Sequence, residues 1–194
     1  HAPIARAPVR LQVLGRHNVS NALAAAAVGL CAGLTLDAVT AALSAATTRS
    51  KWRMQLDQRA DGLAVLNDAY NANPDSMAAA LAAVAQLRRP GGRVVAVLGD
   101  MLELGADADD AHIQIGRLAA SLGVDELVAI GQHAEALVRG YGGCGRPGRY
   151  WSDKELATAD LIGRVTGDDV VLVKASRGIA LETVASALLR EGTR

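Results

Sequence analysis

Apolar side chains repeat along this chain with two different periods, and the change falls at a polar break over residues 47–51. Before the break, residues 9–13 alternate apolar and polar side chains and predict a strand. The alanine-rich residues 18–31 predict a helix that ends at Gly33, and residues 35–46 predict a second helix capped by a threonine. We therefore expect a small, mainly helical segment followed by a domain boundary at residue 51.

Beyond the break, short apolar runs alternate with helical patterns. Strands are predicted at 54–59, 63–67, 93–98, 126–130, 149–151 and 170–173. Helices are predicted at 74–87 and 107–122 and near Ala134, Glu155 and Glu182. Asp61-Gly62 is a typical hairpin turn, so the first two strands are expected to be antiparallel. The alternation predicts an α/β fold, in which a mostly parallel sheet of about six strands has helices on both faces.

Composition narrows the class of protein. Apolar residues make up 51% of the chain, which is enough for a buried core, and because the sequence has no Phe that core must be aliphatic. Lys and Arg together number 20, as do Asp and Glu, so no broad positive field favours nucleic acid or an anionic membrane as a partner. No apolar run approaches the ~20 residues that a membrane span needs.

The two cysteines, Cys31 and Cys144, lack the spacing of metal ligands. Cys31 lies in an apolar helical stretch, where we expect a small core residue. Free thiols without a signal peptide indicate a reducing cytoplasm. The first residue, His1, is not an initiator methionine, so the chain is expected to be part of a longer polypeptide.

Polar residues are dense where the second predicted strand ends, from Asn67 to Ser76. In a parallel sheet, ligands bind beyond the carboxyl ends of the strands. Asp68 could accept ribose hydroxyls there or hold a metal-bound water, and the free amides of the following helix suit an anion. Asn73 and Pro74 fit the cap and first position of that helix, so the alternative is an elaborate cap and turn.

Three further segments carry polar side chains of the same kind. Asp100 and Glu103 lie between glycines after an apolar strand and could face one pocket with His112, or form a solvated loop above a packed histidine. Lys174 and Arg177 follow another apolar strand and could trap an anion, although basic residues also occur on ordinary surface loops. Asn18 and Asn21 are three apart on the first helix, where their amides could contact an adenine edge.

Common catalytic motifs are absent from the sequence. It has no G-x-x-x-x-G-K-[ST] phosphate loop, and its only lysines are Lys51, Lys154 and Lys174. It also has no G-x-S-x-G, C-x-x-C or H-E-x-x-H motif. Pattern alone therefore indicates an α/β domain with several anion-friendly strand ends, and no recognisable catalyst.

The polar segments taken together, in order, resemble the Mur ligase family. The resemblance is carried by residues 15–26, 52–54, 67–77, 99–105, His112 with Gly116, and 173–177. Residues 70–74, Tyr-Asn-Ala-Asn-Pro, are similar to those of the members that add D-alanyl-D-alanine. Relatives that add other amino acids have different residues there. The sequence departs from the family at Asn67, Ala69 and Ala175, and Ala175 requires ordinary backbone angles at a position where the family usually has glycine.

The resemblance implies a division of the chain within a three-domain enzyme. Residues 1–51 would be the carboxyl-terminal tail of the central ATPase domain, and residues 52–194 would be the Rossmann-like carboxyl-terminal domain. The phosphate loop, the metal-binding acids and a carbamylated lysine of the family would lie upstream, in the rest of the same polypeptide.

The resemblance also implies a reaction. The whole enzyme would use ATP and Mg²⁺ to phosphorylate the terminal carboxylate of UDP-MurNAc-tripeptide in the cytoplasm. The amine of D-Ala-D-Ala would then attack the acyl phosphate and form an amide in peptidoglycan precursor synthesis. This chain alone would be inactive. Two alternatives stay open: a Mur ligase that adds a different amino acid, and a stand-alone nucleotide-binding module without catalysis.

Matching motifs assign expected roles to single residues. Arg53 would be catalytic and reach the ATP phosphates, where its fixed fork can offset developing charge. The nucleotide would also contact His17, Asn18, Asn21 and Asp68. The acyl phosphate and incoming dipeptide would lie beside Tyr70, Asn71 and Asn73. The dipeptide carboxylate would contact Lys174, Ser176 and Arg177. Asp100 and Glu103 would line the same cleft or order a loop.

Overall fold

The computed structural model describes residues 5–15, 17–47, 51–146 and 148–190. The chain divides into two compact units, residues 1–50 and residues 51–194. The division falls one residue before the boundary expected from the sequence.

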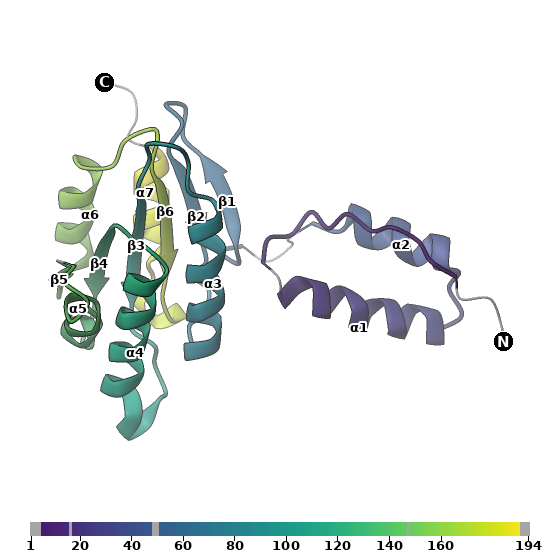
Figure 1. Cartoon of the computed structure of the whole chain (residues 1–194), viewed down its shortest axis with the longest axis horizontal. Helices are drawn as coiled ribbons and strands as arrows, with labels where there is room; N and C mark the ends of the chain where they lie inside the picture. The colour runs from purple at the N-terminus through teal and green to yellow at the C-terminus, as the bar shows by residue number, and fades with distance from the viewer. Residues whose placement is uncertain (1–4, 16, 48–50, 147, 191–194) are drawn as a thin grey trace. The chain divides into compact units, whose positions relative to one another are not determined.

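The first unit contains two helices, α1 (His17–Cys31) and α2 (Leu36–Ala45), which pack against each other (Figure 1). Gly33 lies between them with φ +87°, a conformation that favours glycine. Thr35 caps α2, because its side-chain oxygen accepts a hydrogen bond from the Ala38 backbone N–H at 3.2 Å. Both predicted helices are therefore confirmed.

Two expectations for this unit are wrong. Residues 9–13 form no strand, because among the described residues no neighbouring strand pairs with their backbone groups, and an unpaired strand leaves those groups without partners. Cys31 is exposed rather than part of a core. The described part of the unit buries Val39 alone, since two helices cannot surround each other's apolar faces.

The second unit is built on a six-stranded sheet in the order β1-β2-β6-β3-β4-β5 (Figure 1). Its strands are β1 (Gln55–Gln58), β2 (Ala64–Asn67), β3 (Val94–Gly99), β4 (Glu126–Ile130), β5 (Gly148–Trp151) and β6 (Val170–Lys174). The β1–β2 pair is antiparallel and every other pair is parallel. Gly62 makes the hairpin turn with φ +110°. The predicted strands and sheet are confirmed.

Helices cover both faces of this sheet, as predicted. They are α3 (Pro74–Gln86), α4 (Ala108–Ser121), α5 (Ala134–Gly142), α6 (Lys154–Ile162) and α7 (Glu182–Arg190), with short 3₁₀ turns at η1 (Gly105–Asp107) and η2 (Arg177–Ile179). α3, α4 and α5 contact one another in a row, and α6 contacts α7. Figure 1 shows α7 behind the strands that α3 and α4 cover. Right-handed crossover connections explain why the helices divide between the two faces. The chain moves across the sheet in one direction from β2 through β3 and β4 to β5, and it moves back in the opposite direction from β5 to β6.

The core is aliphatic, as the composition indicates. Every residue of β2, β3 and β6 is buried, so these strands are continuous apolar runs rather than alternating ones. Val95 and Val97 pack with Leu161, Val184 and other buried residues of α6 and α7. None of the described helices is long and apolar enough to cross a membrane.

Candidate functional site: the rim at the carboxyl ends of the strands

The strand register brings the polar strand ends onto one rim. Asn67 of β2 lies opposite Val173 of β6, and Lys174 lies opposite Leu98 of β3. The Asp68 N–H donates to Val173 O at 2.9 Å, and the Ser176 N–H donates to Asp100 O at 3.0 Å. The residues that follow β2, β3 and β6 are therefore neighbours, as expected for a parallel sheet.

Lys174 is buried at the centre of this rim and forms an ion pair with Asp68. The Lys174 side chain is 2% exposed, and its Nζ lies 2.5 Å from Asp68 Oδ2. Nζ also donates to the Asn71 carbonyl oxygen at 2.7 Å. Burial lowers the pKa of Lys174, the Asp68 carboxylate partly opposes this, and the positive charge of Arg53 lowers the pKa further. Lys174 therefore faces Asp68 inside the chain, whereas the motif match predicted a contact with the dipeptide.

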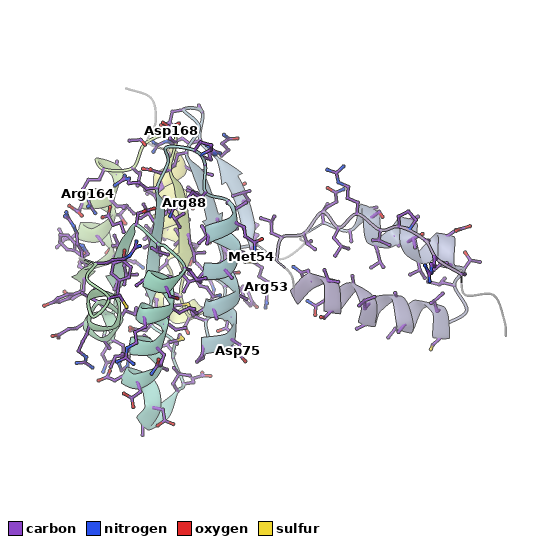
Figure 2. All side chains as sticks on the ribbon, in the orientation of Figure 1. Arg53, Met54, Asp75, Arg88, Arg164 and Asp168 are labelled. Carbon is purple, nitrogen blue, oxygen red and sulfur yellow. The ribbon has the colours of Figure 1, made fainter. Side chains whose placement is uncertain are left out.

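The residues before β1 are bound to the same rim. The Met54 N–H donates to Asp68 Oδ1 at 2.9 Å, and the Tyr70 N–H donates to Trp52 O at 3.1 Å. Both carboxylate oxygens of Asp68 therefore have partners within the chain. Trp52 and Met54 have φ of 59° and 47°, in the left-handed region, on either side of Arg53 (Figure 2).

Two arginines of the rim lie over aromatic rings. The Arg53 guanidinium lies 4.0 Å from the centroid of the Tyr70 ring, and Tyr70 is 41% exposed. The Arg177 guanidinium lies 4.2 Å from the Trp52 ring and pairs with Glu182 at 2.6 Å. Both arginines are exposed. An exposed guanidinium held over a ring is suited to bind a phosphate or carboxylate.

Asp100 lies on the rim, but its carboxylate faces the protein. Asp100 is 3% exposed, and its two oxygens accept hydrogen bonds from the backbone N–H groups of Gln132 and His133 at 2.8 and 2.9 Å. These amides immediately precede α5, so the negative charge also meets the positive end of that helix. The geometry favours the loop-ordering alternative for Asp100. Glu103 is exposed, with φ of 66°.

His112 is packed inside the domain and forms a hydrogen bond to the loop that follows β3. It is fully buried, and its Nε2 accepts a hydrogen bond from the Met101 N–H at 2.9 Å. Because Nε2 is the acceptor, Nδ1 carries the proton and donates to Ala108 O at 2.6 Å. Burial lowers the pKa of His112 and so favours the neutral ring. Of the two interpretations of this residue, the structure favours packing.

Ser176 and Asn73 also bond locally. Ser176 is 5% exposed, and its Oγ accepts a hydrogen bond from the Leu102 N–H at 2.9 Å. Asn73 caps α3: its side-chain oxygen accepts from the Ser76 N–H at 2.8 Å, while Ser76 Oγ accepts from the Asn73 N–H at 3.0 Å. Asn71 and Asn73 are exposed. The predicted cap is confirmed, and the amide of Asn71 remains on the surface beside Tyr70.

The candidate adenine-binding residues belong to the first unit. The Asn18 side chain donates to Leu14 O at 2.6 Å, and the Asn21 side chain donates to Asn18 Oδ1 at 3.0 Å. The two amides therefore share one face of α1, as their spacing predicts. His17 is the first residue of α1, and its side chain lies outside the described part of the chain.

Sequence reasoning missed the other half of the rim. An open cavity of about 520 Å³ lies past β4 and β5 and is lined in part by Gly131, Gln132, Asp153, Lys154 and Ile179. The strand-end rule points to these loops too, but their polar residues look like an ordinary turn and a helix cap. Within the described ranges, no group of three or more His, Cys, Asp or Glu side chains could hold a metal ion.

A mostly parallel sheet with helices on both faces and polar side chains at the carboxyl ends of its strands defines an α/β domain of the Rossmann-like class. Residues 52–177 match the family described as the Mur ligase, glutamate ligase domain. The chain therefore belongs to the Mur ligase family, which confirms the resemblance carried by its motifs.

Relatives of one kind match nearly the whole chain. The UDP-N-acetylmuramoyl-tripeptide--D-alanyl-D-alanine ligase of Mycobacterium tuberculosis H37Rv is 45% identical over 212 residues, which cover 100% of this chain and 42% of the relative. The ligase of the same name from Escherichia coli K12 is 38% identical and covers 98% and 41%. The chain thus spans about two fifths of the length of these relatives.

Solved structures agree with the sequence relatives. A crystal structure of MurF from Acinetobacter baumannii superposes with a TM-score of 0.84 at 34% identity and covers 94% of this chain and 40% of that one. MurF from Thermotoga maritima in complex with ADP gives a TM-score of 0.78 at 27% identity, with coverages of 94% and 40%. The fold of the second unit is therefore that of a Mur ligase carboxyl-terminal domain.

Proposed function

We propose that this chain is part of an ATP-dependent ligase that adds D-alanyl-D-alanine to UDP-MurNAc-tripeptide in the cytoplasm. The observation that carries the proposal is the 45% identity to a ligase of that name over the whole length of the chain. Residues 1–51 would be the tail of a central ATPase domain, and residues 52–194 the carboxyl-terminal domain. The exposed Leu23 and Val28 of α1 are consistent with a helix pair completed by further protein.

The proposed reaction has two steps. The terminal carboxylate of the tripeptide attacks the γ-phosphorus of ATP, and an acyl phosphate and ADP form. The amine of D-Ala-D-Ala then attacks the acyl carbon, loses a proton and displaces inorganic phosphate, leaving an amide. An acyl phosphate hydrolyses readily, so the half-site on this chain would act by closing over it with the rest of the enzyme and excluding water.

The rim residues support specific roles in these steps. Arg53 is exposed and held over Tyr70, so it is the group best placed to meet a phosphate. Arg177 and Asn71 are exposed near it and suit the dipeptide and its carboxylate. Each carboxylate oxygen of Asp68 already has one partner, Met54 or Lys174. Asp68 would therefore accept a ribose hydroxyl through the remaining lone pairs of these oxygens.

The remaining roles depend on residues of the first unit and on residues outside this chain. Asn18 and Asn21, with His17, would contact the adenine. Tyr70, Asn73 and Ser176 would border the acyl phosphate. Mg²⁺ would bind mainly to upstream residues, as the family resemblance implies.

Phosphate release by the full-length ligase containing this chain tests the proposal. Release should require UDP-MurNAc-tripeptide and D-Ala-D-Ala together, and single amino acids should not replace the dipeptide. Arg53→Ala should lower kcat by about 10²-fold or more, which is typical for a lost transition-state contact to charge. Arg149→Ala, an exposed arginine of β5, is the matched control. Robust release by the isolated chain would contradict the proposal.

A further inference from the structure

The segment Trp52–Arg53–Met54 has an unfavourable backbone that its surroundings must stabilise. Trp52 and Met54 both have positive φ, at 59° and 47°, although neither is Gly, Asn or Asp. Large L side chains rarely adopt this region, and it persists only where neighbouring contacts enforce it. The residue between them is Arg53, whose guanidinium lies 4.0 Å from the centroid of the Tyr70 ring.

Several hydrogen bonds hold this conformation, and the one to Met54 comes from Asp68. The Trp52 N–H donates to Gln55 Oε1 at 3.3 Å. Asp68 Oδ1 accepts the Met54 N–H at 2.9 Å, while Oδ2 lies 2.5 Å from Lys174 Nζ. Two residues before Met54 in the sequence, the Trp52 carbonyl oxygen accepts a hydrogen bond from the Tyr70 N–H at 3.1 Å. The Asp68 carboxylate thus joins the bent segment to the end of β6, and its orientation depends on Lys174.

Lys174 has a second effect through its charge. The positive charge of Arg53 lowers the pKa of Lys174 and the negative charge of Asp68 raises it, so the lysine interacts with both groups. Without Lys174, the unpaired carboxylate of Asp68 would attract nearby cations, and the exposed guanidinium of Arg53 is one candidate. With Lys174 in place, the negative charge of Asp68 is already matched, and the guanidinium rests on the ring instead.

We propose that Asp68 and Lys174 form a clasp that positions Arg53. In this clasp, Lys174 neutralises and orients Asp68, Asp68 fixes the Met54 backbone, and the bent segment presents the Arg53 guanidinium on Tyr70, open to an anion. Lys174 is therefore a positioning residue and not a contact for the dipeptide. The consequence for catalysis rests on the proposed function, whereas the positioning of residues 52–54 does not.

Amide hydrogen exchange in the 194-residue chain, followed by NMR, tests the positioning directly. Lys174→Met should speed exchange of the Met54 amide by about tenfold or more, because its acceptor is no longer fixed. The Val170 amide, which bonds to Arg93 O at the other end of β6, should keep its rate and exclude general unfolding. Arg88→Met, which breaks an ion pair with Asp125, is the control and should change neither amide.

A second variant guards against loss of the fold. Asp68→Asn/Lys174→Met removes both charges together, so no unpaired carboxylate stays buried. This double variant is used if Lys174→Met unfolds. Its Met54 amide should also exchange about tenfold faster than in the wild type, because no partner fixes the side chain of Asn at position 68. A Met54 amide that exchanges at the wild-type rate in either folded variant overturns the proposal.

Kinetics of the full-length ligase separate this role from a direct dipeptide contact. Lys174→Met should lower kcat by about tenfold while the KM for D-Ala-D-Ala stays within about twofold. Arg53→Ala/Lys174→Met should be no slower than Arg53→Ala, since Lys174 acts through Arg53. A higher dipeptide KM at unchanged kcat would overturn the positioning role. A wild-type enzyme inactive with D-Ala-D-Ala would refute the proposed function and leave the exchange result standing.

Discussion

The buried polar side chains of the rim bond to one another or to backbone, whereas other polar side chains of the rim are exposed. Lys174, Asp100 and His112 all lie below 4% exposure and have partners in the chain. Arg53 and Tyr70 are exposed and face each other. Burial thus sorts residues of similar type into those that shape the loops and those that can meet a substrate.

His112 should make the stability of the second unit depend on pH. Its pKa in the folded chain lies below the ordinary 6.5, so the unfolded chain takes up a proton first as the pH falls. The free energy of unfolding is fully retained above pH 6.5 and should fall below it, by up to about 1.4 kcal/mol per pH unit, until the folded pKa is reached. Urea unfolding at several pH values measures this slope.

The variant His112→Gln provides the comparison for that slope. Glutamine does not titrate, so the pH dependence between pH 7 and pH 5 should become flatter, even though the variant is less stable at neutral pH. An equal slope in both proteins would show that the titrating group is not His112.

Gly99 and Ala175 should be energetically coupled. A Cβ at residue 99 would lie 2.7 Å from Ala175 Cβ and 3.1 Å from Leu181 Cδ1. Gly99→Ala should therefore destabilise the unit by about 1–3 kcal/mol through overpacking. Gly99→Ala/Ala175→Gly should recover much of the loss, because the closest clash disappears. Denaturant unfolding of the two single variants and the double variant measures the coupling, and strictly additive effects would contradict it.

Helices α4 and α5 lie so close together that glycines are required where they cross. A Cβ at Gly116 would lie 2.1 Å from Leu137 O, and a Cβ at Gly140 would lie 2.1 Å from Ile113 O. Both neighbours are backbone atoms, which cannot rotate away as a side chain can. The glycine of the family motif at residue 116 thus has a packing role.

Gly116→Ala should therefore destabilise the fold strongly, by about 3 kcal/mol, at the upper end of overpacking effects. Gly142→Ala on α5 is the matched control, because nothing lies within 4 Å of the added Cβ. The control should be neutral or slightly stabilising, since alanine favours a helix over glycine. Thermal unfolding compares the melting temperatures of the two variants. Similar melting temperatures would show that α4 and α5 can move apart.

The amino terminus of α3 depends on its cap. Asn73→Ala removes the acceptor for the Ser76 N–H and should cost about 1 kcal/mol of stability. Asn71→Ala, at an exposed residue just before the cap, should change stability by less than about 0.5 kcal/mol. Urea unfolding at neutral pH compares the two, and equal losses would mean that the Asn73 cap contributes nothing specific.

Across the chain, the two units differ in how much they bury. The described part of residues 1–50 buries Val39 alone, whereas residues 51–194 enclose an aliphatic core on both faces of the sheet. Helices without a buried face are marginal in water. Each unit should therefore open with its own free energy.

Hydrogen exchange with mass spectrometry on the 194-residue chain should reveal this difference. Peptides from α1 and α2 should exchange within seconds at neutral pH, while peptides from β3 and β6 should remain protected for hours. A helix pair as protected as the sheet would contradict the expectation and indicate that α1 and α2 are covered in solution.

Local patterns were sufficient to predict most of the fold. Strand and helix ranges, the Asp61-Gly62 hairpin and the Asn73 cap follow from periodicity and capping, which act between residues close in sequence. Parallel pairing then follows from the alternation of strands and helices, and the family from motifs kept in order. Residues 9–13 show the limit, since a period-two pattern cannot supply a partner strand.

The partners of individual side chains came only from the tertiary structure. Lys174 and Asp68 lie 106 residues apart in sequence, and nothing local shows that they meet, that the lysine is buried, or that Asp100 turns toward α5. Burial and charge pairing depend on which strands are neighbours, and strand order is a property of the assembled sheet. The sequence alone identified which residues are polar at the strand ends, and the packing determined which of them remain available to a ligand.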